Sequence, residues 1–215
     1  MLGDGISMEI KICLNKKRTA NIPFAHWLID RFVIPQRIID FGCGSGVILN
    51  TILKLIPDDV DTELYAMDGM EEAKEFLDKR IRFAQCDFSE CGEIYILPEM
   101  VQHQFDWVIS TEVAEHLPKE CAKDFIRLLT NSVYPLGKIF FSAAQPGDGG
   151  EGHYNEQPKK YWRDMFIEMD FEECPHDFET YFQKVCPNQK IDKLTGKRLP
   201  GYARNLMIFR RALHD

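Results

Sequence analysis

The chain has 215 residues, of which 45% are hydrophobic and 28% charged, a composition typical of a globular protein of one domain. The formal net charge of -8 at pH 7 argues against broad nucleic-acid binding. No apolar run reaches the roughly 18 residues that a membrane-spanning helix needs, and the first residues lack the apolar segment of a signal peptide. Seven cysteines without a Cys-x-x-Cys pair predict reduced, structural thiols, so we expect a soluble cytoplasmic protein.

Two basic segments interrupt this acidic composition. Residues 184–211 hold eight Lys or Arg and a single acid, Asp192, so this segment carries +7. A second basic cluster near the start consists of Lys11, Lys16, Lys17 and Arg18. Such clusters are either solvated surface or a binding region for an acidic or phosphorylated substrate, and the sequence leaves both interpretations open.

Strand and helix patterns alternate along the chain. Apolar periodicity and breaker residues predict helices over 24–33, 47–56, 70–79, 119–132 and 158–169, the last beginning at Pro158. The same reasoning predicts strands over 37–41, 63–67, 81–85, 105–110, 138–143, 171–174 and 205–210. Residues 183–203 have little periodicity and are predicted to form a loop or lid. The alternation predicts an α/β fold with a parallel sheet between helices, which binds ligands beyond the carboxyl ends of its strands.

The most informative segment reads IIDFGCGSG over residues 38–46. An apolar strand runs into three glycines and then a helix, so bare backbone and a helix N-terminus can approach a ligand. A dinucleotide fingerprint would need glycine where Val47 stands, and no Gly-Lys-Ser/Thr follows as in a P-loop. A Tyr-x-x-x-Lys match at Tyr134 and Lys138 contains a proline and a glycine, so it is poor support for a short-chain dehydrogenase.

The remaining pattern, Asp-x-Gly-x-Gly-x-Gly, resembles motif I of class I methyltransferases that use S-adenosylmethionine (SAM). The resemblance implies that SAM is the cofactor and that the turn borders it. The residues concerned are Asp40, Gly42, Cys43, Gly44 and Gly46.

Later strand ends are similar to the same family. Asp68, followed by Gly69, ends the second strand, where a carboxylate would accept the ribose hydroxyl protons. Asp87 and Phe88 end the third strand and look like the family's adenine position. The segment STEVAEHLP over 110–118 is similar to the Glu-Val-x-Glu-His strand-four motif of small-molecule methyltransferases. It would place Ser110, Thr111 and Glu112 near the methionine part of SAM.

The resemblance covers about residues 36–145 and implies a fold. We expect a Rossmann-like three-layer sandwich with a mostly parallel seven-stranded sheet and an antiparallel last strand. Residues 1–215 would form one domain, with a helical lead-in over 1–35 and acceptor-side loops and a helix over 147–203. The acceptor would be a small molecule or sugar, and neither nucleic acid nor membrane is expected as a partner.

Two histidines are candidates for catalysis. Methyl transfer needs alignment of the acceptor, and a base only where the acceptor must lose a proton. His116 follows the fourth strand, and His153 lies on a glycine-rich loop with Asn155 and Glu156. Either histidine would accept that proton.

No metal is expected, although one set of residues would suit Mg or Mn. Glu112, Glu115 and His116 have the spacing of one helical face, and His153 would complete the set. Ubiquinone-pathway O-methyltransferases carry a similar Glu-x-x-Glu-His stretch. Small-RNA 2′-O-methyltransferases use such a stretch and a later histidine to hold a metal. A metal-assisted 2′-O-methyltransferase acting on an RNA 3′ end therefore stays an alternative, as do a non-catalytic SAM-binding protein and, more remotely, an oxidoreductase.

Overall fold

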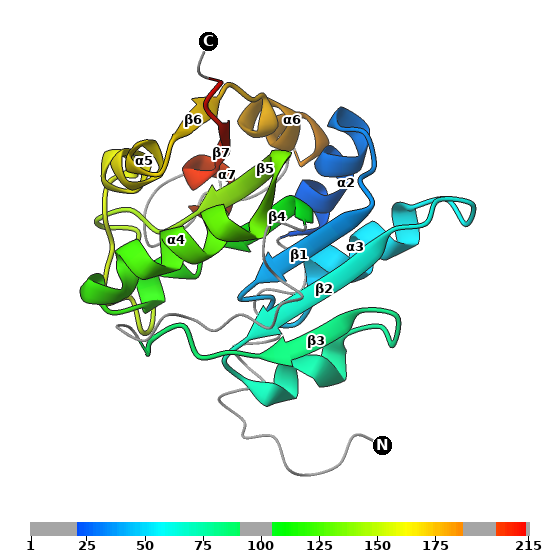
Figure 1. The fold of residues 1–215 in the computed structure, drawn as a ribbon, viewed down its shortest axis with the longest axis horizontal. Helices are drawn as coiled ribbons and strands as arrows, with labels where there is room; N and C mark the ends of the chain where they lie inside the picture. Colours follow the sequence, from blue (N-terminus) through cyan, green and yellow to red (C-terminus); the bar gives the residue numbers. More distant parts are fainter. Residues whose placement is uncertain (1–20, 91–104, 187–200, 214–215) are drawn as a thin grey trace.

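The computed structural model describes residues 21–90, 105–186 and 201–213, and its centre is one twisted sheet (Figure 1). The strands are ordered β3-β2-β1-β4-β5-β7-β6. Strands β1 to β5 run parallel, and β7 runs antiparallel to both β5 and β6. The predicted Rossmann-like sheet is therefore confirmed. The strands are β1 (Arg37–Phe41), β2 (Glu63–Asp68), β3 (Arg82–Gln85), β4 (Phe105–Thr111), β5 (Val133–Ser142), β6 (Phe171–Cys174) and β7 (Met207–Arg211).

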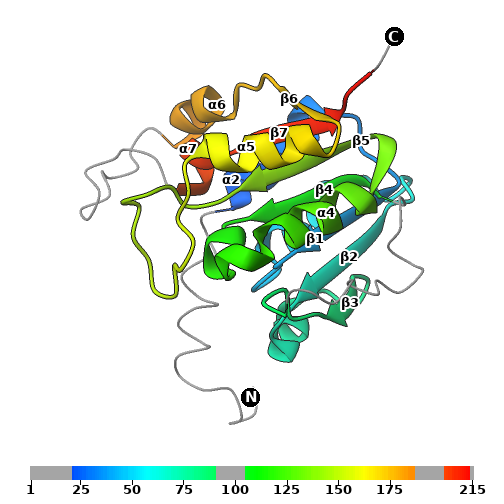
Figure 2. The same ribbon diagram turned by 60° about the vertical axis from the view of Figure 1, so that its left-hand side comes forward.

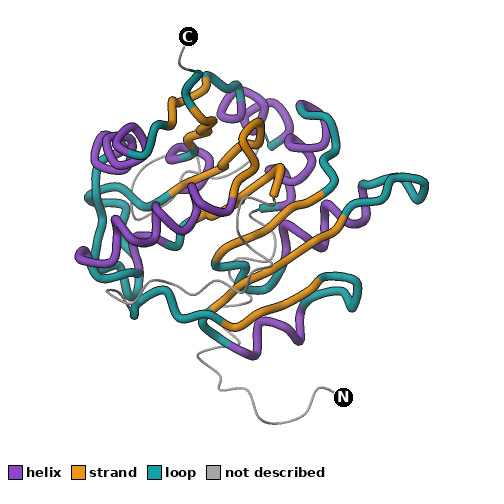
Figure 3. The backbone as a smooth tube through the Cα atoms, viewed as in Figure 1, coloured by secondary structure: helices purple, strands orange, loops and turns teal. Residues whose placement is uncertain are grey.

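Helices cover both faces of the sheet, as the alternating pattern predicts (Figures 1 and 2). One face carries α4 (Ala122–Ser132) and α5 (Lys159–Glu168). The other carries α2 (Ile22–Arg31), α3 (Val47–Leu55), α6 (Phe178–Val185) and the short α7 (Gly201–Asn205). Figure 3 shows the helices as a layer on each side of the strands.

Alternation along the central strands builds two apolar cores. In β5, Ile139 and Phe141 face the α4–α5 side, whereas Phe140 faces the other side. The ring of Phe140 packs edge-on against Phe24 of α2 and Trp107 of β4. Because these strands are buried on both faces, their sequences read as continuous apolar runs. Packing on both faces holds the strands in place, so the carboxyl ends of the parallel strands lie together at one edge of the sheet.

Several predicted boundaries differ from the structure. Residues 70–79 form only a 3₁₀ turn, η1 (Glu71–Phe76). The side chain of Asn50 in α3 donates to the Phe76 carbonyl (2.7 Å) and accepts from the Asp78 amide (2.9 Å), which fixes the chain at the end of this turn. Strand β5 begins at Val133, earlier than predicted, and β7 begins at Met207 because α7 takes up residue 205. Helix α5 begins at Lys159, and Pro158, the predicted first residue, is its N-cap residue.

The predicted lid over 183–203 falls mostly on 187–200, outside the described residues. Its flanks are helical: α6 ends at Val185 and α7 begins at Gly201. The basic cluster over 11–18 also lies outside the described residues. Among the helices that the structure describes, none is long and apolar enough to cross a bilayer.

The cysteines depart from the prediction at one position. Cys43, Cys86, Cys174 and Cys186 are free thiols. Cys121 is disulfide-bonded, so the prediction of reduced thiols is wrong there. Without a Cys-x-x-Cys spacing, the sequence carries no local sign of this bond.

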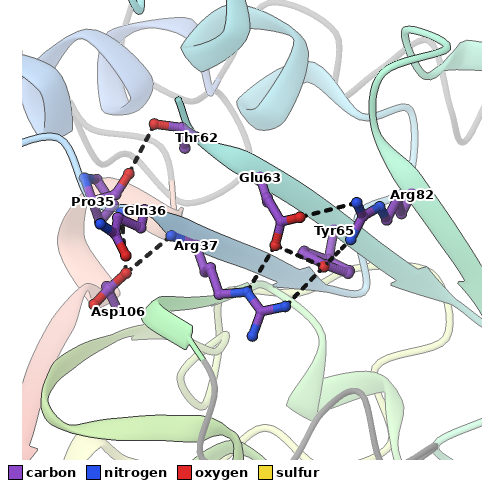
Figure 4. A network of polar contacts seen from close by, with 8 residues as sticks. All are labelled: Pro35, Gln36, Arg37, Thr62, Glu63, Tyr65, Arg82 and Asp106. Atoms are coloured by element: carbon purple, nitrogen blue, oxygen red, sulfur yellow. Dashed lines mark hydrogen bonds and ion pairs between the residues drawn. The ribbon is translucent and has the colours of Figure 1, made fainter. Parts of the chain in front are cut away.

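A polar network closes the amino ends of the strands, at the edge opposite the glycine turn (Figure 4). Glu63 of β2 forms ion pairs with Arg37 (2.8 Å) and Arg82 (2.9 Å). The Asp106 carboxylate of β4 accepts from the backbone amides of Gln36 (3.1 Å) and Arg37 (2.9 Å). These contacts fix the entry to β1 and do not reach the carboxyl edge of the sheet.

Candidate functional site

The glycine turn after β1 requires backbone conformations that favour glycine. Gly42, Gly44 and Gly46 have φ of 76°, 52° and 65°, in the left-handed region where other residues are strained. A Cβ at Gly42 would lie only 2.3 Å from a methyl carbon of Val113. The amides of Gly42 and Cys43 donate to the Met67 carbonyl (2.8 and 3.1 Å), so this turn is fastened to the end of β2.

A cleft of about 250 Å³ opens beside this turn. Its walls come from the segments that directly follow β1 to β4, as expected at the carboxyl edge of a parallel sheet. The lining residues are Gly42, Gly44, Ser45, Asp68, Gly69, Met70, Asp87, Phe88, Glu112, Val113, His116 and Leu117.

Asp68, the last residue of β2, lines the cleft. One carboxylate oxygen accepts from the Gly44 amide (2.8 Å) and the other from the Met70 amide (3.0 Å). The side chain therefore fixes the glycine turn relative to β2 while it lines the cleft. A carboxylate can accept up to about four hydrogen bonds, so these two leave capacity for ribose hydroxyls.

Asp87 and Phe88 form the wall after β3. An Asp87 oxygen accepts from the amide (2.8 Å) and hydroxyl (2.7 Å) of Ser89. These bonds hold the pKa of Asp87 below its usual value, so it is a carboxylate at neutral pH. The Phe88 ring is buried and packs against Phe41 and Phe125.

Other residues that the resemblance assigns to SAM do not line this cleft. Asp40, Cys43 and Thr111 are buried and line a smaller cavity, which shares Gly42 and Ser45 with the cleft. Ser110 is fully buried, and neither it nor Gly46 lines either of these two cavities. Burial raises the pKa of the Cys43 thiol, so Cys43 contributes backbone and not a reactive thiolate.

The segment after β4 does not form the predicted helical turn. Glu112 has a positive φ of 55°, and the 3₁₀ turn η3 spans only Ala114–His116. The Glu112 carboxylate instead lies against Gly201 of α7, where a Cβ would be 2.7 Å from its oxygen. The prediction that Glu112 shares one helical face with Glu115 and His116 is therefore wrong.

The two histidines lie next to each other, and one of them lines the cleft. His116 lines it, and the ring of His153 stands edge-on to that of His116, with centroids 4.7 Å apart. His116 Nδ1 is 3.0 Å from the Gly152 carbonyl, and His153 Nδ1 is 2.9 Å from the Glu156 carboxylate. The amides of Tyr154 and Asn155 donate to the Glu115 carbonyl (2.9 Å each), which docks the glycine-rich loop on η3.

One group of residues in the described part of the chain has the geometry to hold a metal ion. Glu115, His116 and His153 each offer a ligand atom, and these atoms lie within 4.8 Å of one another. Glu112 is not part of the group. Carboxylate and imidazole ligands suit Mn²⁺ or Zn²⁺, and the same imidazoles suit proton transfer.

Sequence reasoning missed several residues of the cleft. It assigned no site role to Ser45, Met70, Val113 or Leu117, although each stands within a few residues of an assigned position. It identified Glu156 only as a hydrogen-bonding group of the glycine-rich loop; in the structure Glu156 accepts from two loop amides and lies 2.9 Å from His153 Nδ1. The signal available for these residues was their place just beyond strand ends or on the glycine-rich loop.

The residues present fit SAM. Gly42, Gly44 and Gly69 line the cleft, and a Cβ at Gly44 would point into open space, so its bare backbone is open to the cleft. Asp68 and Asp87 supply carboxylates, which can accept hydrogen bonds from the ribose hydroxyls and the adenine amino group of SAM. Ordinary phosphate cradles use basic groups near the turn, whereas this cleft is lined by carboxylates.

Comparison with known proteins supports this interpretation. Residues 39–141 match the model of a methyltransferase domain family. A ubiquinone biosynthesis O-methyltransferase of Neisseria meningitidis is 29% identical over 126 residues, covering 59% of this chain and 47% of that protein. The chain thus spans about half the length of the curated relatives it matches.

Solved structures share the fold at low sequence identity. A Haloferax volcanii methyltransferase in complex with the Trm112 methyltransferase activator has a TM-score of 0.62 at 15% identity, with 94% of each chain covered. The Burkholderia thailandensis 1,6-didemethyltoxoflavin-N1-methyltransferase, solved with S-adenosylhomocysteine, has a TM-score of 0.61 at 14% identity, covering 99% of this chain and 94% of that one. Residues 39–141 therefore match a methyltransferase domain, and the solved structures show that the chain shares the fold of SAM-dependent methyltransferases.

Proposed function

We propose that this chain transfers a methyl group from SAM to a small-molecule or sugar acceptor. The observation that carries the proposal is the cleft itself, in which glycine backbone and two carboxylates border a space that leads to a histidine pair. The methyltransferase relatives support the reaction class. The N. meningitidis relative is named an O-methyltransferase, which favours an acceptor hydroxyl.

SAM supplies an activated methyl group on a sulfonium, so the chain's own task is to position the acceptor and exclude water. Asp68 would hold the ribose hydroxyls, and Asp87 with the Phe88 amide would hold the adenine. His153, next to His116, would accept the proton that an acceptor hydroxyl loses as the new bond to the methyl carbon forms. The acceptor would enter beside the loop over 147–157, which is docked on η3 through the Glu115 carbonyl.

The base assignment predicts the behaviour of His153→Ala. Loss of a general base lowers turnover by about 10²–10⁴-fold, whereas SAM affinity should stay nearly unchanged because His153 does not line the cleft. The assay incubates the protein with SAM and three acceptor pools (catechol-type quinone precursors, sugars and small RNA) and measures S-adenosylhomocysteine and the methylated product by mass spectrometry. Equal loss of turnover and SAM affinity would contradict an acceptor-side role.

A second candidate is metal-assisted transfer, which the grouping of Glu115, His116 and His153 favours. In metal sites, a ligating histidine usually donates its other ring N–H to a carboxylate or carbonyl, as His153 and His116 are placed to do. Chelation separates the two candidates. Full turnover after exhaustive EDTA treatment would rule out the metal candidate. Turnover that is restored only by added Mg²⁺ or Mn²⁺ would favour metal-assisted transfer over proton transfer to His153.

A further inference from the structure

Glu156 is the junction of the glycine-rich loop. One carboxylate oxygen accepts from the Gly147 amide (3.0 Å), and the other accepts from the Gly149 amide (2.8 Å) and lies 2.9 Å from His153 Nδ1. The two oxygens of Glu156 thus face three nitrogen donors, the contacts expected of a carboxylate that only accepts hydrogen bonds.

These contacts determine which nitrogen of His153 carries the proton. An ionised carboxylate can only accept hydrogen bonds, so the 2.9 Å contact requires a proton on His153 Nδ1. In the neutral ring, Nε2 then holds the lone pair. The same logic applies to His116, whose Nδ1 faces the acceptor-only carbonyl of Gly152 at 3.0 Å.

The loop also leaves room for the His153 ring. A Cβ at Gly150 would lie 2.2 Å from His153 Nε2 and 2.4 Å from the neighbouring ring carbon. Any side chain at this position would therefore overlap the ring edge that carries the lone pair. The ring is held between the Glu156 carboxylate on one side and the Gly150 backbone on the other.

We infer that Glu156 is a positioning residue that fixes His153 as the Nδ1–H tautomer, and that Gly150, which has no side chain, lets the His153 ring fit against its backbone. For catalysis the inference rests on the proposed function: the acceptor's proton would move to Nε2, and the Glu156 carboxylate would balance the charge of the imidazolium. The tautomer itself does not depend on any acceptor. The inference can therefore be tested without turnover.

The test is long-range ¹H–¹⁵N NMR of the histidine side chains in the full chain, at a pH where His153 is neutral. The His153 signal is assigned by its loss in His153→Ala. We expect the wild-type protein to show the Nδ1–H pattern. Glu156→Ala should shift His153 toward the Nε2–H form, which free histidine prefers. Glu156→Gln should give an intermediate shift, because one amide oxygen cannot serve three donors.

Glu151→Gln is the matched control, since Glu151 is exposed on the same loop and its replacement removes the same charge. We expect it to leave the His153 tautomer unchanged, and Gly150→Ala to move the His153 signals. Calorimetric SAM affinity, measured on every variant, reports whether the cleft is intact. An Nε2–H pattern in the wild type, or an unchanged pattern in Glu156→Ala, would overturn the inference and leave the proposed methyl transfer standing. Failure to find a methylated acceptor would leave the tautomer result standing.

Discussion

Gly42→Ala is expected to lower both the stability of the protein and its affinity for SAM. The backbone at residue 42 has φ of 76°, a strain of roughly 1–3 kcal/mol for alanine. The new methyl group would also lie 2.3 Å from Val113, and overpacking of this kind adds about 1–3 kcal/mol. Because Gly42 and Val113 both line the cleft, relief of the overlap must deform it. Urea unfolding and SAM calorimetry measure the two effects.

Two further variants separate strain from overlap. Gly147 also has a positive φ, 83°, but a Cβ there would meet nothing within 4 Å. Gly147→Ala should therefore show strain alone and keep SAM affinity. The double variant Gly42→Ala/Val113→Ala should recover part of the affinity lost in Gly42→Ala. If Gly42→Ala binds SAM as tightly as the wild type, the glycine turn does not border the cofactor.

Asp68→Ala is expected to weaken SAM binding by about 10- to 100-fold, because a hydrogen bond to a charged group contributes roughly 1.5–3 kcal/mol and about 1.4 kcal/mol is a factor of ten. The change removes the proposed acceptor for the ribose hydroxyls. It also leaves the amides of Gly44 and Met70 without their carboxylate partner, so stability should fall by about 1–3 kcal/mol.

Asp106 offers a matched control at the opposite edge of the sheet. Its carboxylate also accepts from two backbone amides, those of Gln36 and Arg37 (Figure 4). Asp106→Ala should lower stability by a similar amount and leave SAM affinity unchanged. Equal affinities in the two variants would contradict the ribose assignment of Asp68.

Much of the fold follows from local pattern. The apolar runs of β1, β4 and β5 are long enough to identify buried strands, and the glycines after β1 identify the ligand edge. The family resemblance supplied the antiparallel last strand, and the structure confirms it. The predictions that failed concern segments whose structure depends on contacts with residues distant in the sequence. The predicted helix over 70–79 shortens to η1 because Asn50, in another helix, binds its backbone.

The site was predictable at strand ends and less so beyond them. Gly42, Gly44, Asp68 and Asp87 line the cleft because each lies at the carboxyl end of a strand or within three residues beyond it. The spacing of Glu112, Glu115 and His116 assumed a regular helix, and a single positive φ at Glu112 breaks that period. The sequence spacing does not show that the Glu156 carboxylate contacts two backbone amides and a ring nitrogen, because these contacts depend on the backbone conformation of the loop.

Calorimetric titration of the full chain with SAM tests the central claim most directly. The bare backbone of the glycine turn and the carboxylates of Asp68 and Asp87 should bind SAM at a single saturable site, and NAD should give no such heat. Absence of heat with SAM, or saturable binding of NAD in its place, would contradict the account.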